Sequence, residues 1–193
     1  GRENRKHLFE PPFDVFVNKD FDDEARLKSI LQYTHMPANQ SWDVENFLRW
    51  NKKDPIQLHH ISSNSFGYRG ENQKLEKEKN VRRVVVLGSY PAFGHGVNDD
   101  ETYPFILQNN LNAKSKKIKF EVWNAGRQGS TSIMGYAQLK FEVPDLKPDL
   151  IIWDFGWIEL YLALDMVKIN SNRKQMKKEN AATPYVTSIC SNI

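Results

Sequence analysis

The stretch RVVVLGSYPAFGHGV, from Arg83 to Val97, decides the fold class of this chain. Its apolar run Val84–Leu87 ends at Gly88, a pattern typical of a β-strand that is covered on both faces. The residues Ser89-Tyr90-Pro91 then predict a tight turn. In α/β proteins a turn between a strand and a helix is where nucleophiles and phosphate sites lie. The glycines that follow lack both the dinucleotide-binding and the P-loop spacing, which disfavours a phosphate site.

Strands and helices alternate downstream of this stretch. We expect parallel strands near residues 83–87, 119–123 and 150–154, because each is a short apolar or alternating run. The acidic run Asp99–Glu101 is expected to open one helix, and residues 133–143 form a second, stopped by a proline. This order predicts an α/β fold with a parallel sheet whose post-strand loops share one edge, the edge at which such sheets bind ligands.

The sequence divides into three parts. Residues 1–80 are predicted to be a mostly irregular N-terminal extension with one helix near 22–32, packed on the rest through Phe66-Gly67-Tyr68-Arg69. Residues 81–163 form the α/β domain, and residues 164–193 form a polar C-terminal tail. A three-stranded parallel sheet is small, so we expect the domain to be incomplete in this chain or completed by the N-terminal extension.

Composition excludes several classes of function. A net charge of +3 without a basic stripe argues against a nucleic-acid partner. The single cysteine, Cys190, excludes an internal disulfide framework and a multi-cysteine metal site, and we expect no cofactor and no metal. No apolar run is long enough to span a bilayer. The chain begins at Gly1, so an export signal or an anchor upstream of it stays open, as do the compartment and the oligomeric state.

Three post-strand loops in this order resemble those of the SGNH hydrolases, the GDSL-type esterase and lipase superfamily. The family's first motif, G-D-S-x-(T/S)-x-G, is matched by Gly88–Gly94, and its N-x-x-x-x-G motif by Asn124–Gly129. The third, G-x-N-D, is matched by Gly156–Glu159. The stretches GVNDDETYP and SFGYRGE also look like bacterial members. The resemblance covers residues 59–163 and implies a three-layer α/β/α, flavodoxin-like fold and serine-dependent hydrolysis of acyl or acetyl esters of lipid or carbohydrate.

The match fails at the residues that carry the chemistry. Tyr90 stands at the position of the nucleophilic serine, and Ser89 at that of the aspartate. Ile158 replaces the asparagine that would donate to the oxyanion, while Glu159 keeps a carboxylate at the next position. The family's D-x-x-H motif is not found, since no histidine follows His95. Ser89 and Tyr90 are the candidate catalytic positions, and the candidate oxyanion or binding residues are Gly129, Gly156 and Glu159.

Three functions stay open. The first is a degenerate, C-terminally truncated SGNH-type domain without activity, which retains only backbone N–H groups near Ser89, Tyr90 and Gly129. The second is an active esterase that uses Ser89 with a histidine from an unconventional place, such as His95. The third is a binding or scaffold module that holds a small acyl ester or an acetylated carbohydrate.

Several other polar residues have a structural interpretation that we prefer. The pair His59-His60 is expected on an extended arm and not in a catalytic dyad. Asp154 and Glu159 could bind a cation, although carboxylates there usually cap the next helix. Ser130, Thr131 and Ser132 are expected to cap the helix over residues 133–143.

Overall fold

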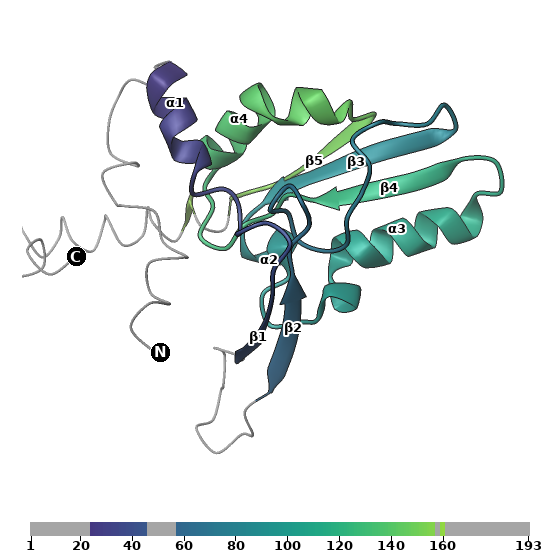
Figure 1. Ribbon diagram of the computed structural model, residues 1–193, viewed down its shortest axis with the longest axis horizontal. Coiled ribbons are helices and arrows are strands. Elements are labelled where there is room, and N and C mark those ends of the chain that lie inside the picture. Colours follow the sequence, from purple (N-terminus) through teal and green to yellow (C-terminus); the bar gives the residue numbers. More distant parts are fainter. Residues whose placement is uncertain (1–23, 46–56, 157–158, 161–193) are drawn as a thin grey trace, which may run out of the picture. The chain divides into compact units, whose positions relative to one another are not determined.

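A three-stranded parallel sheet is the centre of the computed structural model, which describes residues 24–45, 57–156 and 159–160 (Figure 1). Its strands are β3 (Val81–Gly88), β4 (Lys119–Asn124) and β5 (Leu150–Asp154), in the order β4-β3-β5. The three predicted strands and the α/β class are thus confirmed. The chain forms two compact units, residues 1–158 and residues 159–193, and the sheet belongs to the first. The domain boundaries expected at 80/81 and 163/164 stay predictions.

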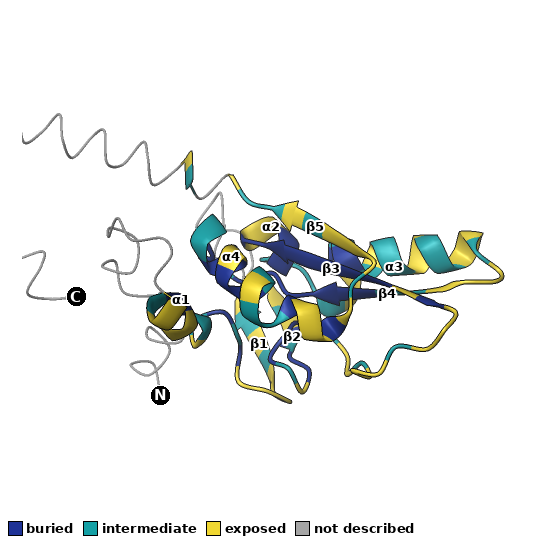
Figure 2. Ribbon diagram, turned by 90° about the horizontal axis from the view of Figure 1, so that it is seen from above, coloured by how far each residue is buried: buried dark blue, intermediate teal, exposed yellow. Residues whose placement is uncertain are grey.

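Strand β3 lies in the middle because its side chains can be buried on both faces. All of its residues except Arg82 are buried, whereas β5 at the sheet's edge carries exposed and half-buried residues (Figure 2). Val85 pairs in register with Trp123 of β4 and with Ile151 of β5. The continuous apolar run that predicted this strand therefore corresponds to the best-shielded strand of the sheet.

Helices cover both faces of the sheet and give three layers. On one face Val84, Val86 and Val122 pack against α3 (Tyr103–Lys114). On the other face lie α4 (Ser132–Phe141) and the 3-10 helix Val143–Leu146. Figure 1 shows α3 and α4 on opposite sides of the strands. The alternation of strand side chains between the two faces explains why consecutive valines belong to different clusters.

The start of β3 is held by a buried cation. The side chain of Arg83 is fully buried, with its guanidinium over the Trp123 ring at 4.9 Å. Its Nε and Nη2 donate to Glu121 Oε2 at 3.2 and 3.0 Å, and its Nη1 donates to the Leu146 carbonyl at 2.6 Å. A charge in this position is tolerated because it is paired and hydrogen-bonded.

The N-terminal part contains more regular structure than expected. Helix α1 (Glu24–Leu31) lies within the predicted helix 22–32, and its Leu27 and Ile30 pack on α4. The strands β1 (Ser41–Glu45) and β2 (Leu58–Ser62) pair as an antiparallel hairpin, which the sequence did not predict; that residues 1–80 are a mostly irregular extension stays a prediction. Both strands are partly exposed, so their sequences lack a strong apolar alternation.

The acidic run before α3 has a different structure from the one expected. Asp99–Glu101 forms a separate 3-10 helix, and α3 begins after it with Thr102 as its N-cap. The Thr102 side chain accepts from the Phe105 N–H. Pro144 does not merely stop α4 but lies inside the 3-10 helix Val143–Leu146. Of the helices described, none is long and apolar enough to cross a membrane.

Candidate functional site

The candidate site begins at the turn after β3, where Gly88 and Ser89 connect the strand to the short helix α2 (Tyr90–Phe93). A Cβ atom at Gly88 would lie 2.6 Å from both Ala92 Cβ and the Asp154 carbonyl oxygen, so a side chain does not fit there. The glycine that the motif contains at this position is therefore required by close packing and not by a positive φ.

Backbone hydrogen bonds join this turn to the loops that follow the other two strands. The Arg127 N–H donates to the Gly88 carbonyl at 2.9 Å, and the Ser89 N–H donates to the Asp154 carbonyl at 3.3 Å. Because the three strands are parallel, their carboxyl ends meet at one edge of the sheet, as expected. The Ser89 N–H donates to a backbone carbonyl of the protein itself. This corrects the expectation that it remains available for the carbonyl or anion of a ligand.

The two candidate catalytic side chains differ in their exposure. Ser89 is only 2% exposed, and its Oγ is buried without a hydrogen-bond partner among the residues described. Tyr90 is 36% exposed, and its ring meets the His95 ring edge-on with centroids 5.6 Å apart. The turn therefore presents Tyr90 to solvent and turns Ser89 inward.

The four histidines in the described part of the chain are engaged elsewhere or shielded. His35 Nε2 lies 3.1 Å from Glu142 Oε2, and His60 Nδ1 lies 3.1 Å from Asp43 Oδ1. His95 Nδ1 contacts Gln128 Nε2. Both ring nitrogens of His59 are buried with no hydrogen bond to any residue described. None of these rings makes a hydrogen bond with the Ser89 hydroxyl, which has no hydrogen-bond partner in the described part of the chain.

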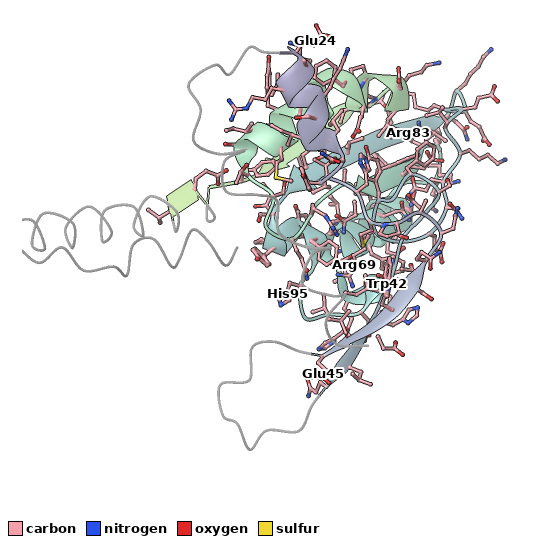
Figure 3. The ribbon with its side chains drawn as sticks, turned by 60° about the vertical axis from the view of Figure 1, so that its left-hand side comes forward. Glu24, Trp42, Glu45, Arg69, Arg83 and His95 are labelled. Carbon is pink, nitrogen blue, oxygen red and sulfur yellow. The ribbon has the colours of Figure 1, made fainter. Side chains whose placement is uncertain are left out.

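Arg69 holds the loop that follows α2. Its Nη1 donates to the carbonyls of Phe93 and Gly94 at 2.7 and 2.5 Å, and its Nη2 donates to that of Val97 at 2.6 Å. Its Nε donates to Asp99 Oδ1 at 2.8 Å. Figure 3 labels Arg69 beside His95 of this loop. Burial lowers the pKa of Arg69, and Asp99 opposes that shift.

Asp99 links the same loop to the hairpin. Its Oδ2 accepts from both the backbone N–H and the hydroxyl of Ser62, at 2.9 and 2.6 Å. The predicted contact through residues 66–69 is present, because the rings of Phe66 and Tyr68 also pack against Trp123. The roles of Arg69 and Asp99 were missed in the sequence. The sequence predicted that Phe66-Gly67-Tyr68-Arg69 packs on the rest of the chain, but not which groups the Arg69 side chain bonds.

The loop after β4 packs tightly on the turn. A Cβ atom at Gly126 would lie 2.6 Å from the Phe93 nitrogen. Arg127 is buried, and burial lowers its pKa to about 10. Thr131 occupies the N-cap position of α4 but its side chain makes no cap hydrogen bond, and the hydroxyls of Ser130 and Thr131 are buried without partners among the residues described. The expectation that these hydroxyls cap the helix is therefore wrong for Ser130 and Thr131.

The structure describes some of the remaining candidate residues and not others. Gly129 and Gly156 have φ values of 71° and 128°, which favour glycine at both positions. Glu159 belongs to the second unit, and Ile158 lies outside the described residues, as do Cys190 and the expected tail 164–193. The roles assigned to Gly129, Gly156 and Glu159 stay predictions.

The Asp154 carboxylate accepts a hydrogen bond from a neighbouring tyrosine. The Tyr103 hydroxyl donates to Asp154 Oδ2 at 3.2 Å, and burial together with this carboxylate raises the pKa of Tyr103. Within residues 24–45, 57–156 and 159–160, no group of three or more His, Cys, Asp or Glu side chains could hold a metal ion. The interaction of Asp154 is therefore with a hydroxyl of α3.

Comparisons with known proteins identify similar solved structures. The chain is similar to the crystal structure of AlinE4, an SGNH-hydrolase family esterase, at 23% identity and a TM-score of 0.40, over 53% of this chain and 57% of that one. Structures of two mutants of the same esterase match at 23% identity and a TM-score of 0.40, over 54% of this chain and 57% of theirs. The chain thus spans less than two thirds of the length of each of these structures. No family model and no curated protein matches the chain.

Proposed function

We propose that this chain is an SGNH-type α/β domain, of ester-hydrolase ancestry, that does not hydrolyse esters through Ser89. The observation that carries this proposal is the orientation of the turn after β3. Tyr90, at the motif's nucleophile position, faces solvent, while the Ser89 hydroxyl is buried without a partner among the described residues. The ancestry is supported by the positions of Gly88, Gly129 and Gly156 at or after the carboxyl ends of the three parallel strands.

Acyl transfer by a serine needs a base within hydrogen-bond reach of its hydroxyl and an orienting group behind that base. None of the described residues makes a hydrogen bond with the Ser89 Oγ. A phenol is in general a poor nucleophile for acyl transfer without a strong activator. Ser89 thus lacks, in the described part of the chain, the hydrogen-bonded base that this reaction requires.

Stabilisation of the oxyanion is also weakened at this turn. In sites of this kind, losing one preorganised donor slows the reaction about 100- to 1,000-fold. The Ser89 N–H donates to the Asp154 carbonyl and is not directed at a ligand. Ile158 supplies no hydrogen-bond donor from its side chain.

A binding module for a small acyl ester or an acetylated carbohydrate is the second candidate. It is favoured by one observation, the exposed Tyr90 ring beside His95. An aromatic ring with a polar end suits a ligand that is part apolar and part hydroxylated. Binding by Tyr90 would require no activated serine.

The test of the first proposal is turnover of p-nitrophenyl acetate by the wild type, Ser89→Ala and His95→Ala. Ser130→Ala is the matched control, since Ser130 is also buried with an unpartnered hydroxyl among the described residues. We expect all four proteins to show the same background rate. A wild-type rate about tenfold or more above that of Ser89→Ala or His95→Ala, with Ser130→Ala unaffected, would establish the esterase alternative instead.

A further inference from the structure

A side-chain contact joins the loop after α2 to the loop after β4. Gln128 Nε2 contacts His95 Nδ1, and the neighbouring Arg127 N–H donates to the carbonyl of Gly88, the last residue of β3. An amide nitrogen only donates, so Nδ1 must accept. The imidazole is then neutral, with its proton on Nε2.

The groups around His95 disfavour a positive charge. The guanidinium of Arg69 and the imidazole of His59 face it from the turn after β2 and from β2, and Tyr90 faces it from α2. The carboxylate paired with Arg69 is that of Asp99, which also accepts from the Ser62 hydroxyl. Burial, and then the charges of Arg69 and His59, lower the pKa of His95.

His59 reaches this place because of its position on the hairpin. It pairs with Val44 and lies on the same face as Ile61 and Trp42, the face that packs against Phe93 of α2. The adjacent His60 lies on the opposite face, where it bonds Asp43. The two neighbouring histidines therefore differ in what they contact, and His60 can serve as a control for His59 and His95.

We propose that the His95–Gln128 contact is a pH-sensitive latch between the loop after α2 and the loop after β4. A neutral imidazole accepts the Gln128 amide proton and holds the loops together. A protonated imidazole presents N–H to N–H, loses the contact and adds a positive charge beside Arg69, so the loops separate. The latch determines whether these two loops at the edge of the sheet are held together, and it does not depend on any catalytic activity.

The direction of the effect follows from linkage. In the closed state the His95–Gln128 contact is present, and in the open state it is broken. His95 binds a proton less readily in the closed state, so acid favours opening. The effect begins as the pH falls below the ordinary histidine value of about 6.5 and is complete below the lowered value of the closed state. Between about pH 7.5 and about pH 5.5 one suppressed histidine can raise the opening constant up to about tenfold.

The experiment is amide hydrogen exchange, corrected for the intrinsic pH dependence, at about pH 7.5 and about pH 5.5. The reporter is the N–H of Arg127, the residue before Gln128, which donates to the Gly88 carbonyl at the end of β3, and the reference is the Val122 N–H, which donates to Gln108 Oε1 at 2.8 Å. The variants are His95→Gln, Gln128→Glu and, as the matched control, the exposed His60→Gln. A carboxylate at position 128 accepts from a protonated imidazole, so this variant reverses the response.

We expect the protection of Arg127 to fall up to about tenfold on acidification in the wild type and in His60→Gln, with no such fall at Val122. We expect no such fall in His95→Gln and none in Gln128→Glu. A wild type whose Arg127 protection does not change on acidification would overturn the proposal. That result is expected if the Gln128 amide turns over, because its oxygen then accepts from the protonated ring and the contact is kept. A full response retained by His95→Gln would also overturn it. The His95 ring signals, followed by NMR across the same range in the wild type, must titrate below the ordinary value.

Discussion

The Nε of Arg69 lies 2.8 Å from Asp99 Oδ1, and this pair joins the N-terminal hairpin to the loop that carries His95. The Arg69 side chain is 1% exposed and the Asp99 side chain 22%. The guanidinium also donates to three carbonyls of residues 93, 94 and 97. A charge this deeply buried is retained only where it is paired, so the pair determines how firmly the hairpin is attached.

Replacing Arg69 is expected to destabilise the protein severely. In Arg69→Met the Asp99 carboxylate loses its partner and three carbonyls lose their donor. Breaking a buried pair from one side costs about 3–5 kcal/mol of the free energy of unfolding. Urea denaturation measures this loss. The exposed pair Lys28–Glu24, at 2.7 Å, provides the comparison, and Lys28→Ala should change stability by less than about 0.5 kcal/mol. Equal effects of the two substitutions would contradict the structure.

Gly126→Ala tests the close contact between the loop after β4 and α2. The added Cβ would lie 2.6 Å from the Phe93 nitrogen and 2.7 Å from the Ala92 carbonyl carbon, which are backbone atoms that cannot rotate away. We expect a loss of about 1–3 kcal/mol in the free energy of unfolding, because overpacking forces backbone shifts. Thermal unfolding followed by circular dichroism measures it. An unchanged midpoint would show that the two segments do not pack this closely.

The two leucines of β3 and β5 should respond differently to truncation. Leu87 is fully buried, whereas Leu150 is 56% exposed. Leu87→Ala is expected to cost about 2–5 kcal/mol through lost burial and a cavity. Leu150→Ala should cost less than about 0.5 kcal/mol, as is usual at exposed positions. Chemical denaturation of both variants decides whether β3 is the central strand; a larger loss at Leu150 would reverse the assigned strand order.

Acid should weaken the fold partly through Asp149. Its Oδ2 accepts from the Arg83 N–H at 2.7 Å and from Lys77 Nζ at 3.0 Å, and these bonds lower the pKa of the Asp149 carboxyl. A carboxyl whose pKa is lower in the folded state stabilises the protein above the unfolded value, near ~3.9, and loses this contribution as the pH falls through the folded value. We therefore expect wild-type stability to fall more steeply than that of Asp149→Asn between about pH 5 and about pH 3, measured by urea denaturation. Parallel pH profiles would exclude this role.

The sequence predicted the central sheet because its signal is local. The run Val84–Leu87 is apolar at consecutive positions, and only a strand shielded on both faces uses such a run. The hairpin β1–β2 was missed because its strands are half exposed, so residues such as Asp43 and His60 interrupt any apolar alternation. Its strands are also separated by residues 46–57, which removes the short-turn signal of a hairpin.

For the candidate site, the sequence predicted the positions of the glycines but not the interactions of the side chains. Gly88 and Gly156 lie where the motif positions indicated, the first as the last residue of β3 and the second after β5. The partners of Asp99 could not be found from local pattern, because an acidic residue before a helix is ordinarily interpreted as a favourable N-terminal charge. Its actual partner, Arg69, is 30 positions away in the sequence. Whether a side chain at a turn faces inward or outward, as Ser89 and Tyr90 do, depends on packing that the sequence does not express.

Covalent labelling by a fluorophosphonate probe tests the central claim most directly, because it detects an activated serine without requiring turnover. The wild type, Ser89→Ala and Tyr90→Ser are incubated with the probe, and intact mass and peptide mapping locate any adduct. With Ser89 buried and no base bonded to its hydroxyl in the described part of the chain, we predict no adduct at position 89 in the wild type and none at position 90 in Tyr90→Ser. A stoichiometric adduct on Ser89 of the wild type, absent from Ser89→Ala, would contradict the account and identify a working serine nucleophile.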